Sequence, residues 1–270
     1  MPKEKVETTE MVATENLVLD LTLFDSLKSA DGTIAGMEAM ESSDIKMPRI
    51  KLVQSTSEEA QKGHCKAGQF YNSVTGEAKD KLNVVLLVMG KSRVRFEEPY
   101  KRGAQPLCRS LDGKCSMDGE ICSGCEYADW DKAKDAGKDS PACRQGITWL
   151  FVEEDGLNSI PPRIVVSGAS MGEHKNFLTK LAGLGGYPPY ILVTEITAEQ
   201  QQNDKGIFYV MKFDFAKNED GTIRTVTPEM AKRFAELSKQ WGSMTSRLAE
   251  YDTERYDDSS VAGDSEGAIY

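Results

Sequence analysis

Alternating apolar and polar positions run through the chain from residue 46 onward and predict a protein built mainly of β-strands. In the first such stretch, Ile50 and Leu52 alternate with Arg49 and Lys51, as expected for a strand with one buried face. The longest stretch covers residues 82–96, and its second half alternates sharply. Further strands are predicted over residues 68–72, 147–152, 163–167, 190–194 and 206–213.

Two other stretches repeat with the period of a helix. Ser170 is a suitable N-cap for a helix over residues 171–182. Thr227 and Pro228 open a second helix, and its apolar stripe consists of Met230, Phe234, Leu237, Trp241, Met244 and Leu248. Short strands with turns and a helix between them predict an α+β fold that is mainly β, namely an OB-like, partly open barrel with a C-terminal amphipathic helix. A mixed sandwich is the alternative.

Both ends of the chain are acidic and lack the periodicity of the body. Residues 1–45 carry 3 basic and 10 acidic side chains, and residues 247–270 carry 2 basic and 7 acidic side chains. The whole chain has a net charge of -10, whereas residues 46–144 carry 18 basic and 14 acidic side chains. We therefore expect a largely flexible segment over residues 1–45, a folded domain over 46–250 and a flexible acidic tail over 251–270.

Five of the 6 cysteines lie between residues 108 and 143, and their spacing predicts a metal site. Cys122 and Cys125 form a C-x2-C pair, and a tetrahedral zinc site needs two further ligands. Cys143 supplies the downstream ligand, and Cys108 is preferred over Cys115 as the upstream one. The prediction is a structural Zn²⁺ ion in an insertion at about residues 104–145, with the ligands Cys108, Cys122, Cys125 and Cys143.

Disulfides and free thiols are the alternatives for these cysteines, and Cys65 and His64 are further candidate ligands. Disulfides need an oxidising compartment, and the N-terminus leads into acidic residues rather than an apolar export signal. The segment between the cysteines is too polar to build an apolar core, so a metal would hold it together. We expect an intracellular protein without membrane contact, because the longest apolar run, residues 84–89, is too short to cross a bilayer.

The sequence lacks the recognisable motifs of catalysis. It contains neither a Walker loop nor a dinucleotide-binding glycine motif, and neither of its two histidines lies near a nucleophile elbow. A site of four thiolates leaves no open position on a metal ion. We therefore predict no catalytic residues and no enzymatic activity, and the closed thiolate set disfavours a nuclease or other metal enzyme.

Cationic and aromatic side chains on the predicted strands favour a binding function instead. Proteins that bind single strands combine positive charge for the phosphates with aromatic rings for the bases. Lys91, Arg93 and Arg95 share one face of the long strand. The predicted DNA-binding residues are Arg49, Lys51, Tyr71, Lys91, Arg93, Arg95, Trp149 and Tyr209. The alternative is that the charges line a solvated edge and the rings belong to the core.

The acidic tail ends in an apolar tip, which suits docking into basic pockets of partner proteins. The residues expected to make these contacts are Asp257, Asp258, Asp264, Glu266, Ile269 and Tyr270. A tail that only keeps the protein soluble is the alternative.

Taken together, these motifs resemble the single-stranded DNA-binding proteins of tailed bacteriophages. The similar stretches are residues 45–54, 68–70 with 75–77, 106–110 before Cys122, Cys125, Trp130 and Cys143, and 167–170 before Phe177 and Leu178. The resemblance implies an OB barrel with a zinc-binding insertion that coats single-stranded DNA during phage replication and recombination. It also implies a tail that recruits replication or recombination proteins in the cytoplasm of the infected bacterial host. The alternative is a zinc-stabilised replication or transcription accessory protein that binds proteins rather than DNA.

Overall fold

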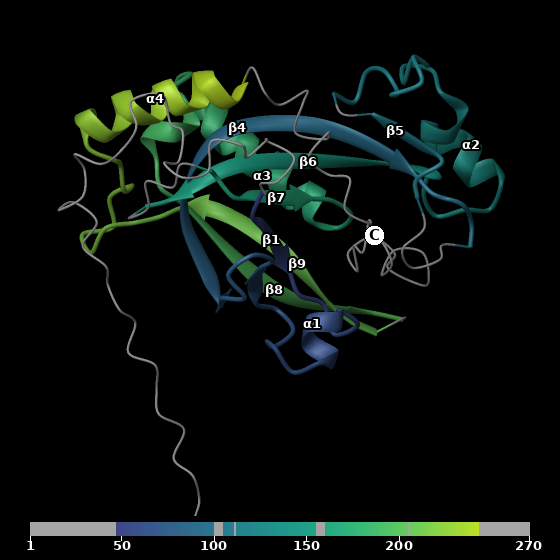
Figure 1. Cartoon of the computed structure of the whole chain (residues 1–270), viewed down its shortest axis with the longest axis horizontal. Helices are drawn as coiled ribbons and strands as arrows, with labels where there is room; N and C mark the ends of the chain where they lie inside the picture. The colour runs from purple at the N-terminus through teal and green to yellow at the C-terminus, as the bar shows by residue number, and fades with distance from the viewer. Residues whose placement is uncertain (1–46, 100–104, 111, 155–159, 205, 243–270) are drawn as a thin grey trace, which may run out of the picture. The chain divides into compact units, whose positions relative to one another are not determined.

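A computed structural model gives the fold of residues 47–99, 105–110, 112–154, 160–204 and 206–242, and the description below covers these residues. The chain divides into two units, Met1–Asp44 and Ile45–Tyr270, and all the described residues belong to the second. Strands predominate in this unit and a few helices flank them (Figure 1), so the fold is mainly β with α, as predicted. Among the described residues, no helix is long and apolar enough to span a membrane.

The elements follow one another along the chain in an order that mixes strands and helices. The strands are β1 (Arg49–Leu52), β2 (Phe70–Asn72), β3 (Ala78–Lys79), β4 (Lys81–Arg95), β5 (Cys108–Ser110), β6 (Cys143–Glu153), β7 (Arg163–Val166), β8 (Thr194–Asn203) and β9 (Gly206–Phe215). The helices are α1 (Glu58–Gln61), α2 (Trp130–Asp135), α3 (Ser170–Gly183) and α4 (Pro228–Gly242), with the 3-10 turns η3 (Glu126–Ala128) and η4 (Pro189–Ile191).

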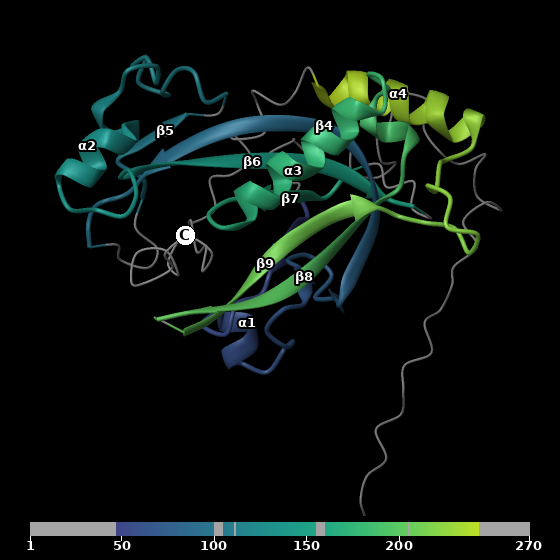
Figure 2. The ribbon, with the colours of Figure 1, turned by 180° about the vertical axis from the view of Figure 1, so that it is seen from behind.

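All the described strands form one sheet, whose order is β3-β2-β1-β7-β6-β4-β8-β9, with β5 paired to β4. The pairing is antiparallel except between β1 and β7. The long strand β4 joins the two halves, because its start pairs with β8 and the rest of it pairs with β6. The sheet curls around this strand into a half-barrel (Figures 1 and 2). A curled sheet with a helix between its strands is consistent with an OB-like fold, whereas a sandwich needs two sheets.

The curled sheet is closed along the free edge of β9 by two polar side chains. Gln54, which follows β1, accepts a hydrogen bond from the Tyr209 backbone N–H at 2.8 Å and donates one to the Tyr209 carbonyl at 3.0 Å. Ser170 Oγ, at the start of α3, accepts a hydrogen bond from the Met211 backbone N–H at 2.9 Å. These contacts satisfy backbone groups that an open sheet edge leaves unpaired.

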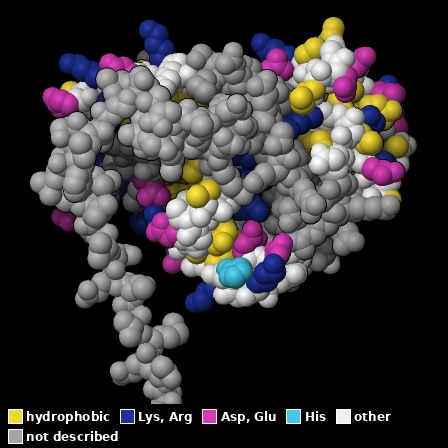
Figure 3. Space-filling view, viewed as in Figure 1, with side chains coloured by type: hydrophobic (Ala, Val, Ile, Leu, Met, Phe, Trp, Pro, Cys, Tyr) yellow, Lys and Arg dark blue, Asp and Glu magenta, His cyan; other side chains and the backbone are white. Residues whose placement is uncertain are grey.

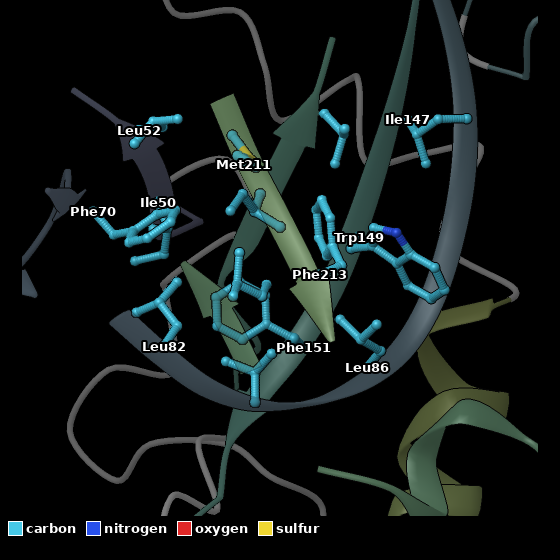
Figure 4. Close-up of a cluster of buried hydrophobic side chains, with 14 of the residues drawn as sticks. Ile50, Leu52, Phe70, Leu82, Leu86, Ile147, Trp149, Phe151, Met211 and Phe213 are labelled. Carbon is cyan, nitrogen blue, oxygen red and sulfur yellow. The ribbon is translucent and has the colours of Figure 1, made fainter. Parts of the chain in front are cut away.

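The main hydrophobic core fills the inside of the curl, and we call the side of the sheet that faces it the core face. It joins side chains from β1, β2, β4, β6, β7, β8, β9 and α3. In Figure 4 the labelled side chains converge from strands that are far apart in the sequence; they are Ile50, Leu52, Phe70, Leu82, Leu86, Ile147, Trp149, Phe151, Met211 and Phe213.

Helix α4 covers part of the opposite side of the sheet, which we call the outer face. Phe234 packs with Val85, Leu87 and Val152, and Trp241 packs with Leu150 and other apolar side chains. This helix was predicted from its apolar stripe, and the stripe residues Met230, Phe234, Leu237 and Trp241 do lie in the contact with the sheet. The rest of the outer face, toward the far end of β4 and β6, is not covered by any described helix (Figure 1).

One predicted strand is wrong, and the short elements β3, β5, α1 and α2 were not predicted. The predicted strand over residues 190–194 is instead the turn η4, and β8 runs from Thr194 to Asn203. Pro188 and Pro189 favour the turn, because proline fixes φ and cannot donate a hydrogen bond to a sheet. The polar run of glutamines and glutamate in β8 lacks the apolar alternation by which strands are recognised.

Candidate nucleic-acid interface and thiol cluster

The strand register brings Cys108 and Cys143 to the same face of the sheet. Arg95 of β4 lies opposite Cys108 of β5 on one side and opposite Cys143 of β6 on the other. Residues that lie opposite each other on neighbouring strands point to the same face. Both thiols therefore project from the core face of the sheet, on either side of Arg95.

The loop between β5 and η3 brings Cys122 and Cys125 close to Cys108 and Cys143. The Cys125 backbone N–H donates a hydrogen bond to the Cys122 carbonyl at 3.3 Å, and Gly124 between them has φ +78°, a conformation that glycine adopts without strain. The thiols of Cys122 and Cys125 both affect the pKa of Cys108, and Cys125 affects that of Cys143. We call these four residues the thiol cluster.

Burial and neighbouring charges set the acidity of the thiol cluster. Burial raises the pKa of Cys108 and Cys143, and the other thiols raise it further. Arg95 lowers the pKa of Cys108, and Arg93 lowers that of Cys143 through its charge and a side-chain hydrogen bond. Only a thiolate binds a metal ion, so the two guanidinium groups favour the form of the cysteines that a metal requires.

The donor set fits zinc chemically, because four cysteine thiolates are a common set of ligands for a structural zinc ion. All six cysteines are free thiols, which leaves the four available as ligands. Within the described ranges there is no ready-formed group of three or more His, Cys, Asp or Glu side chains that could hold a metal ion. The thiols would therefore have to draw together on binding, and the structural zinc stays a prediction.

The other candidate ligands lie apart from the thiol cluster. Cys115 is exposed, and its thiol donates a hydrogen bond to the Gly119 carbonyl at 3.3 Å. His64 and Cys65 follow α1, which both views show far from β5 and α2 (Figures 1 and 2). The strand register sets Cys108 on the same face as Cys143, and Cys108 stays the predicted upstream ligand.

Lys91, Arg93 and Arg95 share one face, as predicted, but it is the core face and it points toward the segment between β5 and β6. Lys91 lies opposite Ile147 of the main core, and a Cβ added at Gly113 would lie 3.3 Å from the Lys91 Cβ. Arg95 lies over the Tyr127 ring at 3.7 Å. Lys91 is exposed, whereas Arg93 and Arg95 are half-buried, so two of the three cations expected to bind DNA serve the thiol cluster.

The same strands carry arginines on the outer face. Val94 of β4 lies opposite Arg109 of β5 and Arg144 of β6, so the two arginines flank Val94 in a single row across the sheet. Farther along, Arg163 of β7 lies opposite Leu150 of β6 and beside Arg49 of β1. The two pairs of arginines are separated by the six residue steps of β6 from Arg144 to Leu150, which is roughly 20 Å of strand.

Small side chains occupy the outer face between the two pairs of arginines. We call this whole surface the arginine face; it consists of Arg49, Arg109, Arg144 and Arg163, with Gly90, Ser92, Val94, Gly146, Thr148 and Val165 between them. A Cβ added at Gly90 would meet no described atom within 4 Å. No strand position in this set is acidic. Each of the four arginines also makes a polar, charged or ring contact within the chain, so a ligand would have to bind alongside or in place of that contact.

Two further predicted DNA-binding residues border the arginine face. Lys51 lies on the outer side of β1, opposite Tyr71 of β2, and both are half-buried. Lys51 donates a hydrogen bond to a Glu59 carboxylate oxygen at 3.2 Å, so its charge is already balanced within the chain. Arg49 and Tyr71 are therefore the predicted residues whose placement agrees best with a surface for nucleic acid.

Trp149 is a core residue, which corrects its predicted role in stacking. It is 2% exposed, and its indole N–H donates a hydrogen bond to His174 Nε2 at 2.8 Å. Burial lowers the pKa of His174 to about 4, so the imidazole is neutral at pH 7 and accepts this bond. A ring enclosed by the core cannot present its flat side to a base.

Tyr209 was expected to bind DNA, but its ring is half-buried and its flat side is not free for a base. Tyr209 packs against the main core, and its hydroxyl donates a hydrogen bond to Gln200 Oε1 at 3.2 Å. A Cβ added at Gly68 would come within 2.6 Å of the Tyr209 ring, so the ring lies against the backbone there. Phe208, one residue away on the strand, points to the other side of β9.

The remaining predicted site residues lie outside the described part of the chain. These are the tail residues Asp257, Asp258, Asp264, Glu266, Ile269 and Tyr270. Sequence reasoning, for its part, did not single out Arg144 or Arg163. The sequence did indicate the position of both arginines, because each lies on a strand whose other face carries buried residues such as Ile164 and Ile147.

Comparison with known proteins identifies a phage protein family. The family model described as Pam3 phage gp34-like protein matches residues 14–247 of the chain. Searches of curated proteins and of solved structures found no match.

Proposed function

Because the chain belongs to the Pam3 phage gp34-like protein family, we propose that it is a phage protein that binds single-stranded DNA through its arginine face, without sequence specificity. The observation that supports this proposal is the concentration of four arginines on one face of the curled sheet with no acidic strand position between them. Arginine is well suited to phosphate, because its planar guanidinium group makes paired hydrogen bonds to phosphate oxygens.

The small residues between the arginines support a single strand as the ligand. An OB-like barrel binds oligonucleotides across the outside of its middle strands and through adjoining loops, and β6 and β7 are middle strands of this sheet. Gly90, where an added Cβ would meet no described atom within 4 Å, leaves room for the chain of a ligand to approach the backbone of the sheet. Gly146 is instead buried beside Ser92 and Val165. A single strand can lay its bases flat on such a surface, whereas the bases of a duplex face one another.

In this proposal the protein acts without catalysis during phage replication or recombination, in the cytoplasm of the infected host. Zinc bound to the thiol cluster would fix β5, which includes Arg109, together with the segment between β5 and β6. The acidic tail would be left to meet replication or recombination proteins. The resemblance to tailed-phage single-stranded DNA-binding proteins supports each of these roles.

A titration with labelled oligo-dT tests the proposal. Fluorescence anisotropy of the purified full-length chain is followed at several salt concentrations, with a duplex of the same length as the control. We expect binding to the single strand that weakens steeply as salt rises, because each phosphate contact releases bound counterions, and much weaker binding to the duplex. Absence of single-strand binding at low salt would contradict the proposal.

A zinc-stabilised accessory protein that binds proteins rather than DNA is the second candidate. Residues 105–142 carry 8 acidic and 5 basic side chains, and Figure 3 shows apolar side chains on the surface in the region of β5 and α2. Trp130 there is 53% exposed. Binding to a replication or transcription protein that does not weaken with salt, together with no binding to oligo-dT, would favour this candidate.

A further inference from the structure

A short hairpin after β5 extends the row of side chains that contains Arg109 and Arg144. The Met117 backbone N–H donates a hydrogen bond to the Arg109 carbonyl at 2.9 Å, and Ser110 pairs with Ser116. This antiparallel register sets Met117 opposite Arg109, so the two point to the same face. Arg144, Val94, Arg109 and Met117 therefore form one continuous row across four neighbouring segments of chain.

Ile121 lies on the same side of this hairpin. It pairs with Cys115, and Cys115 precedes Ser116, which pairs with Ser110 of the core face. Cys115 and Ile121 therefore lie on the outer face, where Arg109 lies. Met117 is 62% exposed and Ile121 is 70% exposed. Two large apolar side chains are thus held in water directly beside a row of arginines, where burial of either one in a complex would be favourable.

The glutamate of the hairpin points the other way. The Ser116 backbone N–H donates a hydrogen bond to the Glu120 carbonyl at 2.7 Å, so Glu120 lies opposite Ser116, which pairs with Ser110 of the core face. The Glu120 side chain therefore projects from the core face, while Ile121, its neighbour in the sequence, projects from the outer face. A polyanion that runs along the arginines would meet Met117 and Ile121 without meeting the Glu120 carboxylate.

We propose that Met117 and Ile121 form an apolar contact for the bases of a single strand whose phosphates lie on the arginine face. This inference rests on the proposed function and adds a place for the bases to it. Bases present apolar flat surfaces, and thymine adds a methyl group that apolar side chains contact readily. The flexible, polarisable side chain of methionine adapts to differently shaped partners, which fits binding without sequence specificity.

Paired probes separate the contact with bases from the contact with phosphates. Full-length protein is titrated by fluorescence anisotropy with oligo-dT and with an oligonucleotide of equal length that has abasic sites throughout. The double variant Met117→Ser, Ile121→Ser should lose about fivefold in affinity for oligo-dT, the lower end of the effect of removing one stacking side chain. Its affinity for the abasic probe should not change. Arg109→Gln should weaken both probes alike, and Ile207→Ser, at a side chain that is 49% exposed on β9, should change neither.

A second variant tests the same contact in the opposite direction. Ile121→Trp enlarges the apolar surface and should tighten oligo-dT binding while leaving the abasic probe unchanged. Equal ratios of the two affinities in wild type and in both variants would overturn the inference, while oligo-dT binding itself would leave the proposed function standing. Failure of the wild-type chain to bind oligo-dT at all would instead remove the proposed function and this inference with it.

Discussion

At the scale of single residues, the hydrogen bond between Trp149 and His174 links the packing of the core to the protonation state of a histidine. Both side chains are at most 2% exposed, and His174 also makes an edge contact with the Phe213 ring at 5.7 Å. A neutral imidazole accepts the Trp149 N–H, whereas a protonated one has no lone pair with which to accept it. The sequence placed Trp149 on a strand and His174 on a helix, but their contact depends on how α3 packs on the sheet.

We expect this histidine to make the fold sensitive to acid. Because the pKa of His174 falls from 6.5 to about 4 on folding, the stability it contributes is present above pH 6.5 and is lost as the pH falls toward 4. The loss is on the order of 3 kcal/mol when complete. Thermal melts of wild type and His174→Gln between pH 7 and pH 4 check this: the stability difference between them should shrink as the pH falls. A constant difference would contradict it.

Gly90 gives a second test at the residue scale, because it separates binding from folding. A Cβ at this position meets no described atom within 4 Å, and a β-branched residue suits a strand better than glycine by about 0.5–1 kcal/mol. We expect Gly90→Val to fold normally and to lose roughly tenfold in affinity for oligo-dT, or about 1.4 kcal/mol, because the side chain rises into the arginine face.

Gly183→Ala is the matched control for this change, since glycine 183 also meets no described atom but lies in α3. Its binding should equal that of wild type. Normal oligo-dT affinity in a correctly folded Gly90→Val variant would show that the ligand does not pass over the middle of the arginine face.

At the scale of elements, a bulge in β4 decides which side chains lie on the outer face of the sheet. Before it, Leu86 lies on the core face opposite Phe151, and after it Val88 lies on the outer face opposite Leu150. The extra residue, Leu87, has its carbonyl bonded by Ser238 of α4 at 2.9 Å. A bulge of one residue moves every later side chain to the other face.

This bulge explains how far the sequence predicted the site. Alternation correctly divided Lys91, Arg93 and Arg95 from Ser92 and Val94 on the two faces of β4. It could not show which face points outward, because the run of apolar residues before the bulge has no polar position to mark the change. The four cysteines, whose spacing is a local signal, were predicted more directly than the arginines, whose proximity depends on the order of the strands.

The segment between β5 and β6 provides a test of the zinc prediction. Its described residues bury little apolar surface, and Ala133 is the buried residue of α2. If the thiol cluster binds zinc, Cys122→Ser should release the metal and lower the melting temperature, because the metal supplies much of the folding energy of such a segment. Zinc is measured with a colorimetric chelator in the unfolded protein.

Cys115→Ser is the control for that measurement, because the exposed Cys115 thiol lies outside the thiol cluster. It should keep both the zinc content and the melting temperature of wild type. A purified wild-type protein that contains no zinc, and whose melting temperature does not respond to added zinc, would contradict the prediction.

At the scale of the whole molecule, the charges are arranged so that an acidic protein can still present a cationic surface. The net charge of the chain is -10, but its ends hold much of the excess of acidic residues. The two faces of the sheet around β4 carry different features. The core face holds the hydrophobic core and the thiol cluster, and the outer face holds α4 and the arginine face. Attraction between exposed charges falls off within about 10 Å at 0.1 M salt, so the local charge of a face matters more for binding than the net charge.

The most direct test of this account compares the salt dependence of oligo-dT binding for two pairs of substitutions. Arg109→Gln with Arg144→Gln removes two charges from the arginine face, and Lys232→Gln with Arg233→Gln removes two from exposed positions of α4. The account predicts that the first pair weakens binding and reduces the slope of log K against log salt by about 1.4, at about 0.7 for each phosphate contact with a single strand, while the second leaves the slope unchanged. The reverse result, or equal slopes for all three proteins, would contradict it.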